Sequence, residues 1–213
     1  MPALCPPWLC FDLGGPHRVL SFAPHNGGFH SARRILWREV RNADLTPDLD
    51  APAWLARELQ AIGARDQVCF LTSRSLTAHV TRDARAANAL ATAVVTAGLG
   101  NAERIGARLP RTWQDWGTIN IAVRLTCALS DVALIEAITL AAEARTAAVL
   151  DAGVDLPVGR ATGTGTDCIA IAAPPGDIAF AGKHTATGEA LGRAVHDATS
   201  AAVTDWVAQN KAR

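Results

Sequence analysis

The chain has 213 residues, of which 49% are hydrophobic and 19% are charged, a composition that excludes a disordered chain and supplies an ample core. Twenty basic residues balance twenty acidic ones, so the basic excess typical of nucleic-acid-binding proteins is missing. The five cysteines are odd in number, widely spaced and without a Cys-x-x-Cys pair, which argues against a disulfide framework or a zinc site. No signal-peptide pattern and no uncharged stretch long enough to span a bilayer is present. We therefore expect a cytoplasmic protein with neither nucleic acid nor membrane as a partner.

The first half of the chain predicts four strands and one long helix. A Gly14-Gly15-Pro16 turn separates the first two strands, and Gly63 ends the helix, whose apolar residues recur at helical spacing. Residues 76–88 are ambiguous, and we predict a short helix there. The predicted strands cover residues 8–11, 18–22, 30–40 and 67–71, and the helix covers residues 53–62.

The second half predicts three strands and two helices. Ser130 and Asp131 begin the longest helix, and Gly153 ends it. The last helix is amphipathic and follows a polar loop over residues 182–188. The predicted strands cover residues 90–97, 117–125 and 168–173, and the helices cover residues 130–152 and 189–209.

The two halves show the same order of elements. Each contains a strand, a Gly/Asn turn, a strand, a helix that ends in glycine, and a further strand. This order suggests an internal ββαβα duplication of residues 17–88 and 90–210, with the Asn26-Gly27-Gly28 turn and residues 101–120 in related positions. The predicted architecture is a single α/β domain over residues 1–213, a mixed β-sheet covered by helices, with a site at the strand ends near these turns.

The stretch Ala161-Thr162-Gly163-Thr164-Gly165-Thr166-Asp167 is the strongest candidate for chemistry. Two glycines and three threonines precede one carboxylate, and an apolar strand follows at once. Glycines allow the backbone to approach a ligand closely, and the carboxylate could act as a base or an anchor. The alternative is a tight turn in which the threonines only cap one another.

Other polar side chains have a functional and a structural interpretation each. Glu143 lies among alanines on the long helix, where a raised pKa and a general acid or base role are conceivable; alternatively it lies in a solvated stripe and pairs with Arg145 or another cation. Asn26 and Asn120 adjoin glycine turns and could hold a carbonyl or an oxyanion, or could satisfy their own turns. His184 could serve as an acid or base, although isolated histidines are more often ordinary surface or core residues. No histidine spacing supports a metal site.

Six stretches, in this order, resemble the adenosylcobinamide amidohydrolase (CbiZ) family over residues 17–204. His25 stands where an aliphatic residue is expected from the resemblance, and Arg145 stands where lysine is usual. The six stretches cover residues 21–28, 96–101, 117–121, 142–148, 161–167 and 180–194, the last without its central loop.

The resemblance implies hydrolysis of the amide that joins the aminopropanol arm to the corrin ring of adenosylcobinamide, giving adenosylcobyric acid in cobalamin salvage. The substrate itself carries cobalt and an adenosyl group, and we expect no further cofactor and no metal. A homo-oligomer is left open. Alternatives are a corrinoid- or nucleotide-binding protein without turnover and a structural or assembly protein.

The chemistry of amide hydrolysis suggests roles for these residues, because it needs an activated water, oxyanion donors and an acid for the leaving amine. Asp167 or Glu143 would be the base, and the other carboxylate or His184 the acid. A threonine nucleophile at 164 or 166 is the less favoured variant. Trp113 and Trp116 could lie on the corrin face or simply pack in a loop. The expected substrate-binding residues are Asn26, Gly27, Gly28, Asn101, Thr118, Asn120, Thr162, Gly163, Thr164, Gly165 and Thr166.

Overall fold

The computed structural model describes residues 1–41, 44, 46, 48–111 and 116–210. Its main feature is an eight-stranded mixed sheet with the strand order β4-β3-β2-β12-β8-β6-β5, in which β1 also pairs with β2. Two small two-stranded sheets, β9–β10 and β7–β11, lie outside it. The strands are β1 (Ala3–Cys5), β2 (Trp8–Ser21), β3 (Gly28–Glu39), β4 (Val68–Thr72), β5 (Val80–Ala86), β6 (Ala89–Ala97), β7 (Ala102–Glu103), β8 (Ile119–Leu125), β9 (Asp155–Leu156), β10 (Gly159–Arg160), β11 (Gly163–Thr164) and β12 (Cys168–Ala173). The helices are α1 (Ala51–Ala61), the short 3-10 helix η1 (Leu76–Ala78), α2 (Asp131–Asp151) and α3 (Ala186–Asn210).

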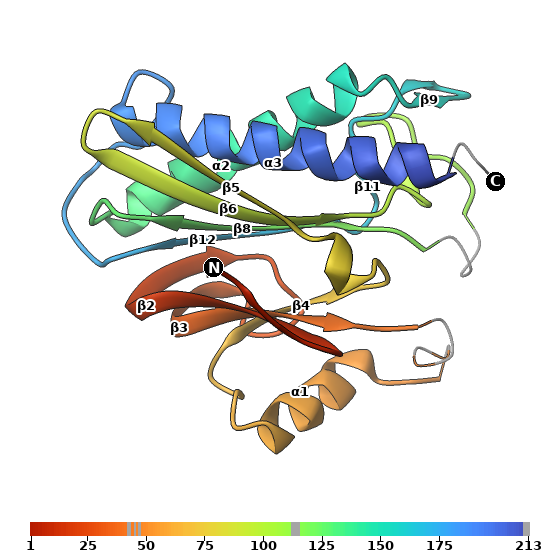
Figure 1. The fold of residues 1–213 in the computed structure, drawn as a ribbon, viewed down its shortest axis with the longest axis horizontal. Coiled ribbons are helices and arrows are strands. Elements are labelled where there is room, and N and C mark those ends of the chain that lie inside the picture. Colours follow the sequence, from red (N-terminus) through yellow and green to blue (C-terminus); the bar gives the residue numbers. More distant parts are fainter. Residues whose placement is uncertain (42–43, 45, 47, 112–115, 211–213) are drawn as a thin grey trace.

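The sheet folds over on itself into two layers (Figure 1). One layer contains β2, β3 and β4 with α1 on its outer face, and the other contains β5, β6, β8 and β12 with α2 and α3 on its outer face (Figure 1). Buried side chains of both layers form a common core. In it Trp37 and Phe70 pack edge to face, with their ring centroids 5.1 Å apart. The same cluster contains Val94, Ala122 and Ala170 of the opposite layer. Apolar side chains on both faces of the strands therefore explain the near-continuous hydrophobic runs in the sequence.

Strand pairing confirms the expected duplication for four of its five elements. In the first half β2 is antiparallel to β3, and β3 is parallel to β4 across α1. In the second half β6 is antiparallel to β8, and β8 is parallel to β12 across α2. The fifth element differs, because β5 extends the sheet edge in the first half whereas α3 packs over β5 and β6 in the second.

The structure corrects two predictions of local structure. The strands predicted at residues 8–11 and 18–22 form one long strand, β2, which ends at Ser21, because β3 pairs with it on both sides of an irregularity between Asp12 and His17. Within this bulge Gly14 has a φ of +81° and donates to Asp12 Oδ1 at 2.8 Å. Residues 80–86 form a strand instead of the predicted helix, and its hairpin turn places Ala87 at a φ of +46°.

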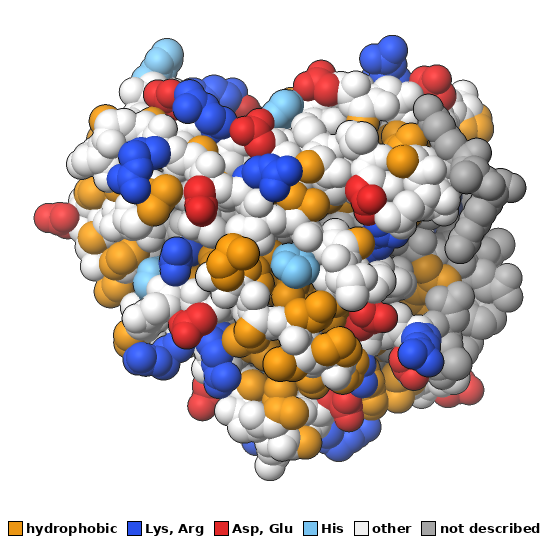
Figure 2. Space-filling model, viewed as in Figure 1, with side chains coloured by type: hydrophobic (Ala, Val, Ile, Leu, Met, Phe, Trp, Pro, Cys, Tyr) orange, Lys and Arg blue, Asp and Glu red, His pale blue; other side chains and the backbone are white. Residues whose placement is uncertain are grey.

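The other predicted helices are confirmed with shifted ends. Ser130 caps α2 by accepting a hydrogen bond from Ala133 N, as the sequence indicated. Helix α3 begins at Ala186, three residues before the prediction, because Thr185 Oγ1 accepts from Gly188 N at 2.9 Å and caps the helix there. In the described part of the chain no helix has both the length and the apolarity to cross a membrane. On the face shown in Figure 2, acidic and basic side chains are interspersed.

Candidate functional site

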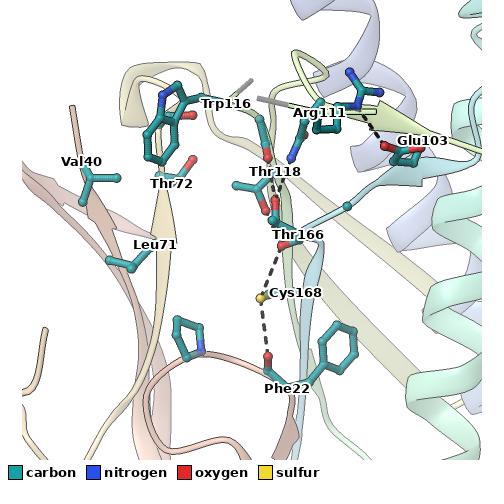
Figure 3. Close-up of a pocket in the computed structure, with 15 residues that line it drawn as sticks. Phe22, Val40, Leu71, Thr72, Glu103, Arg111, Trp116, Thr118, Thr166 and Cys168 are labelled. Carbon is teal, nitrogen blue, oxygen red and sulfur yellow. Dashed lines mark hydrogen bonds and ion pairs between the residues drawn. The ribbon is translucent and has the colours of Figure 1, made fainter. Parts of the chain in front are cut away.

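A cavity of about 590 Å³ opens between the two layers at one end of the sheet. The amino ends of β8 and β12 meet the carboxyl end of β4 at this edge. Figure 3 shows Val40 and Leu71 on one side of the cavity, Thr118, Thr166 and Cys168 on the other, and Phe22 at one end. Most of the lining is apolar, and a few polar groups converge on it, as in pockets that hold small molecules.

Segments that are far apart in the sequence meet in this cavity. Phe22 and Pro24 come from the first Gly/Asn turn, Asn101 follows β6, Thr118 precedes β8, and Thr166 belongs to the Gly/Thr loop. These residues represent four of the six stretches that resemble the amidohydrolase family. Four of the six stretches therefore line a common cavity at the strand ends.

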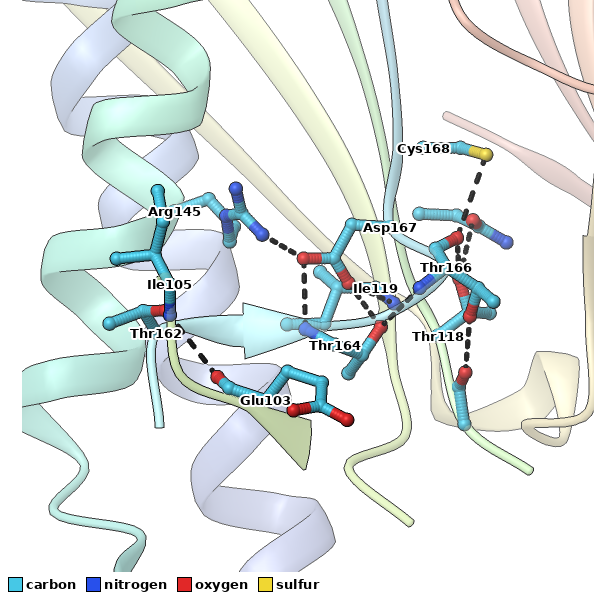
Figure 4. A network of polar contacts seen from close by, with 12 residues as sticks. Glu103, Ile105, Thr118, Ile119, Arg145, Thr162, Thr164, Thr166, Asp167 and Cys168 are labelled. Carbon is cyan, nitrogen blue, oxygen red and sulfur yellow. Dashed lines mark hydrogen bonds and ion pairs between the residues drawn. The ribbon is translucent and has the colours of Figure 1, made fainter. Parts of the chain in front are cut away.

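A hydrogen-bonded network fixes the polar wall of the cavity (Figure 4). Thr166 Oγ1 donates to Gly117 O at 2.6 Å and accepts from Asn101 Nδ2 at 3.2 Å, while Thr118 Oγ1 lies 2.8 Å from Thr166 O. Because Thr166 has one hydroxyl proton and Gly117 O can only accept, Asn101 must present its NH2 group to Thr166. Gly117 has to be glycine, since a Cβ would lie 2.7 Å from Gly98 O on the neighbouring loop.

Asn120 supports the cavity without lining it. Its side chain is fully buried, and Nδ2 donates to Leu71 O at 2.7 Å, which ties β8 to the end of β4 in the opposite layer. Oδ1 lies 3.2 Å from Thr118 Oγ1. Since Leu71 and Thr118 both line the cavity, this bond holds its two sides together.

Asp167 occupies the centre of a second cluster, directly behind the polar wall (Figure 4). Its carboxylate pairs with Arg145 of α2 and accepts from Ile119 N and Thr164 N, each at 3.1 Å, and from Thr164 Oγ1 at 2.5 Å. The Arg145 and Asp167 side chains are 16% and 8% exposed, and burial lowers the pKa of Arg145 from its usual value. Asp167 does not line the cavity, although its neighbours Thr166 and Cys168 do.

Glu103 is a carboxylate of the cavity wall that the sequence analysis missed. It pairs with Arg111 Nε at 2.9 Å, and this hydrogen bond lowers the pKa of Glu103 below its usual value. A second cavity of about 860 Å³ adjoins the first and shares Glu103, Arg111 and Gly165 with it. Glu103 could have been found from the sequence by its position two residues after Asn101, which lies in a glycine-rich turn.

Cys168 lies inside the cavity as a neutral thiol. Its Sγ is 3.5 Å from Phe22 O, and burial raises its pKa to about 11. At neutral pH the thiolate that nucleophilic attack requires is therefore scarce.

The other predicted residues do not line this cavity. Glu143 pairs with Lys183, both side chains are more than half exposed, and His184 beside them is exposed as well. Asn26 Nδ2 donates to Arg65 O at 2.9 Å and to Gln67 O at 3.0 Å, so its amide secures the α1–β4 connection. The position of Glu143 matches its structural alternative, a solvated stripe with a cation as partner. Asn26 matches neither interpretation, because its amide bonds to the distant α1–β4 connection instead of to its own turn or to a ligand.

The remaining predicted residues divide between the loop and the cavity. Thr162 Oγ1 accepts from Ile105 N at 2.8 Å, and Gly163 packs against the Arg145–Asp167 pair. Gly165 and Trp116 line the cavity, whereas Gly27 and Gly28 do not, and Trp113 lies outside the described residues. No set of three His, Cys, Asp or Glu residues in the described ranges is arranged to hold a metal ion.

A two-layered mixed sheet with helices on both outer faces, and with a cavity at its strand ends, defines an α/β protein whose cavity has the character of a small-molecule site. The model of the CbiZ family, described as adenosylcobinamide amidohydrolase, matches residues 3–211, and the chain therefore belongs to this family. No curated protein matches the sequence.

Proposed function

We propose that this protein cleaves the aminopropanol amide of adenosylcobinamide to give adenosylcobyric acid and 1-amino-2-propanol, as a cytoplasmic step of corrinoid salvage. One observation carries the proposal: four of the six segments that carry the family resemblance converge on one cavity with an apolar lining and a fixed polar wall. A binding protein without turnover would also need such a cavity, so the proposal is tested by its product.

The size of the cavity suggests how such a substrate would bind. At about 590 Å³ it has the volume of sites that enclose drug-sized ligands, and a corrinoid is considerably larger than these. We propose that the aminopropanol arm and its amide enter the cavity while the corrin ring lies over the rim, where Glu103 and Arg111 lead into the adjoining cavity. Phe22, which is 52% exposed, supplies an aromatic surface at the opposite end of the cavity (Figure 3).

Glu103 is the proposed base, since Glu143 and His184 are placed elsewhere. Its lowered pKa keeps the carboxylate ionised at neutral pH, so it can take a proton from water. The water oxygen then bonds to the amide carbon, and the Arg111 N–H groups that Glu103 Oε1 and Ala102 O do not occupy would donate to the developing oxyanion. Collapse of the tetrahedral intermediate breaks the C–N bond, and the proton passes from Glu103 to the departing nitrogen. Water is the only co-reactant of the proposed reaction.

Mass spectrometry of adenosylcobinamide after incubation with the folded protein tests the proposal. Release of adenosylcobyric acid and 1-amino-2-propanol in equal amounts is the expected result. Unchanged substrate that co-elutes with the protein would instead identify a corrinoid-binding protein, and the absence of both product and binding would refute any corrinoid function. Glu103→Gln should lower kcat by about a hundredfold, the size of a general acid–base contribution, while retaining affinity for the substrate.

A further inference from the structure

The Asp167 carboxylate has its hydrogen-bonding capacity filled by the protein. Oδ1 accepts from Ile119 N and Thr164 Oγ1, and Oδ2 accepts from Arg145 and Thr164 N. A carboxylate has about four acceptor sites, so none remains for a water that would have to be deprotonated.

Arg145 provides the only charged partner of this carboxylate among the described residues. It reaches Asp167 from α2, and the pair lies directly against Gly163, where a Cβ would come within 2.5 Å of Asp167 Oδ2. Two buried opposite charges and one glycine thus determine where the Gly/Thr loop lies on α2 and β8. Removing one member of such a pair leaves an uncompensated buried charge, whereas neutral replacement of both members is often tolerated.

The pair is linked to the cavity by two short steps. Thr164, held by Asp167, is two residues from Thr166, and Thr166 N lies 3.4 Å from Thr164 Oγ1. Thr166 in turn positions the amide of Asn101 in the cavity wall. On the other side, Ile119 N connects Asp167 to the start of β8, directly after Thr118.

We infer that Arg145 is a positioning residue for the proposed hydrolysis: through Asp167 it sets the position of the 163–166 loop and of the cavity wall. The inference rests on the proposed function, and it assigns Asp167 to the same positioning role instead of proton transfer. The two roles differ in a measurable way. A positioning pair can be replaced by a neutral pair, but a base cannot be replaced by an amide.

The test compares Arg145→Met, Asp167→Asn and the double variant. In the double variant an asparagine Oδ1 can still accept from Ile119 N and Thr164 Oγ1, and no buried charge is left without a partner. We expect each single variant to lose ten- to a hundredfold in kcat/KM and the double variant to recover to within about tenfold of wild type. Arg145→Lys, which keeps the charge, should retain more activity than Arg145→Met. The acid limb of the pH profile should be the same in the double variant and in wild type.

Arg193→Met is the matched control, because Arg193 pairs with Glu189 in an exposed ion pair on α3. It should leave kcat/KM unchanged. All rates are compared at a temperature well below the lowest melting temperature of the set. If a single variant does not fold, Arg145→Lys and the double variant still distinguish a positioning role from proton transfer.

A double variant as inactive as Asp167→Asn would overturn the inference and identify Asp167 as a proton acceptor. Wild-type turnover is measured in parallel, so a failure of the proposed function is distinguished from a failure of the positioning role. If wild type binds adenosylcobinamide without cleaving it, the same variants are compared by their Kd, with loss in the single variants and recovery in the double variant supporting the positioning role. If wild type neither binds nor cleaves it, both proposals are refuted.

Discussion

Asn120→Ala should destabilise the protein substantially, because Asn120 joins the two layers of the sheet. Truncation removes the donor to Leu71 O and leaves this buried carbonyl without a partner, which costs about 1–3 kcal/mol. The space of the lost amide adds about 0.5–1 kcal/mol, since the flanking strands are held by their ladders and cannot collapse into it. Thr118 Oγ1 keeps its bond to Thr166 O, so no further penalty arises there. The expected loss in the free energy of unfolding is about 1.5–4 kcal/mol.

For a chain of this length each kcal/mol shifts Tm by about 2–4 °C, so we expect Asn120→Ala to lower Tm by about 3–16 °C. Differential scanning calorimetry and urea unfolding would measure the change in Tm and in midpoint. Asn88→Ala, in the exposed β5–β6 turn, is the matched control and should remain within about 0.5 kcal/mol of wild type. A loss at Asn120 no larger than that of the control would show that the bond between the layers contributes nothing to stability.

Three further predictions concern the site and one turn. Arg111 lowers the pKa of Glu103, so activity that needs the ionised carboxylate persists into mildly acidic buffer and disappears only as the pH falls through this lowered pKa. Arg111→Met should therefore move the acid limb of the kcat/KM profile to higher pH. An unmoved limb would exclude Glu103 as the base. Ala87→Gly should raise the free energy of unfolding by up to about 1 kcal/mol, because Ala87 has a φ of +46°, and a lower Tm would contradict this reasoning. Alkylation by iodoacetamide at pH 8, followed by mass spectrometry, should modify exposed Cys5 well before Cys168, whose pKa burial raises to about 11; equal rates would refute the placement of Cys168.

Features set by neighbouring residues were predictable from the sequence. Ser130 caps α2 as expected, because a cap and its helix lie within one turn of chain. The β5 strand was missed because its alternating burial depends on α3, which packs over it from the other end of the chain. The continuity of β2 was missed for the same kind of reason, since β3 holds it together across a bulge that looks like a turn.

In the candidate site too, local features were predictable from the sequence and distant contacts were not. Its loops were identified from glycine, asparagine and threonine, which have local conformational meaning. The partners of the charged side chains in the site could not be identified, because spacing along the chain does not reveal which side chains meet. Arg145 was weighed as a partner for Glu143, two residues away, but it pairs with Asp167 in another element, and Glu143 pairs with Lys183. Glu103 was overlooked because its significance comes from the cavity that it lines.

The duplication relates two asparagines that make different contacts. In each half an asparagine in the loop between the first two strands donates through Nδ2 to the connection between helix and third strand: Asn26 to Arg65 O and Gln67 O, and Asn101 to Thr166 Oγ1. In the first half both connections are short, and the asparagine amide closes them against each other with two backbone bonds. In the second half the corresponding connections, residues 98–118 and 152–167, are longer, and the asparagine meets a side chain instead of two carbonyls. The longer connections of the second half supply Asn101, Thr118 and Thr166 to the cavity, whereas the shorter connection after β2 supplies Phe22 and Pro24.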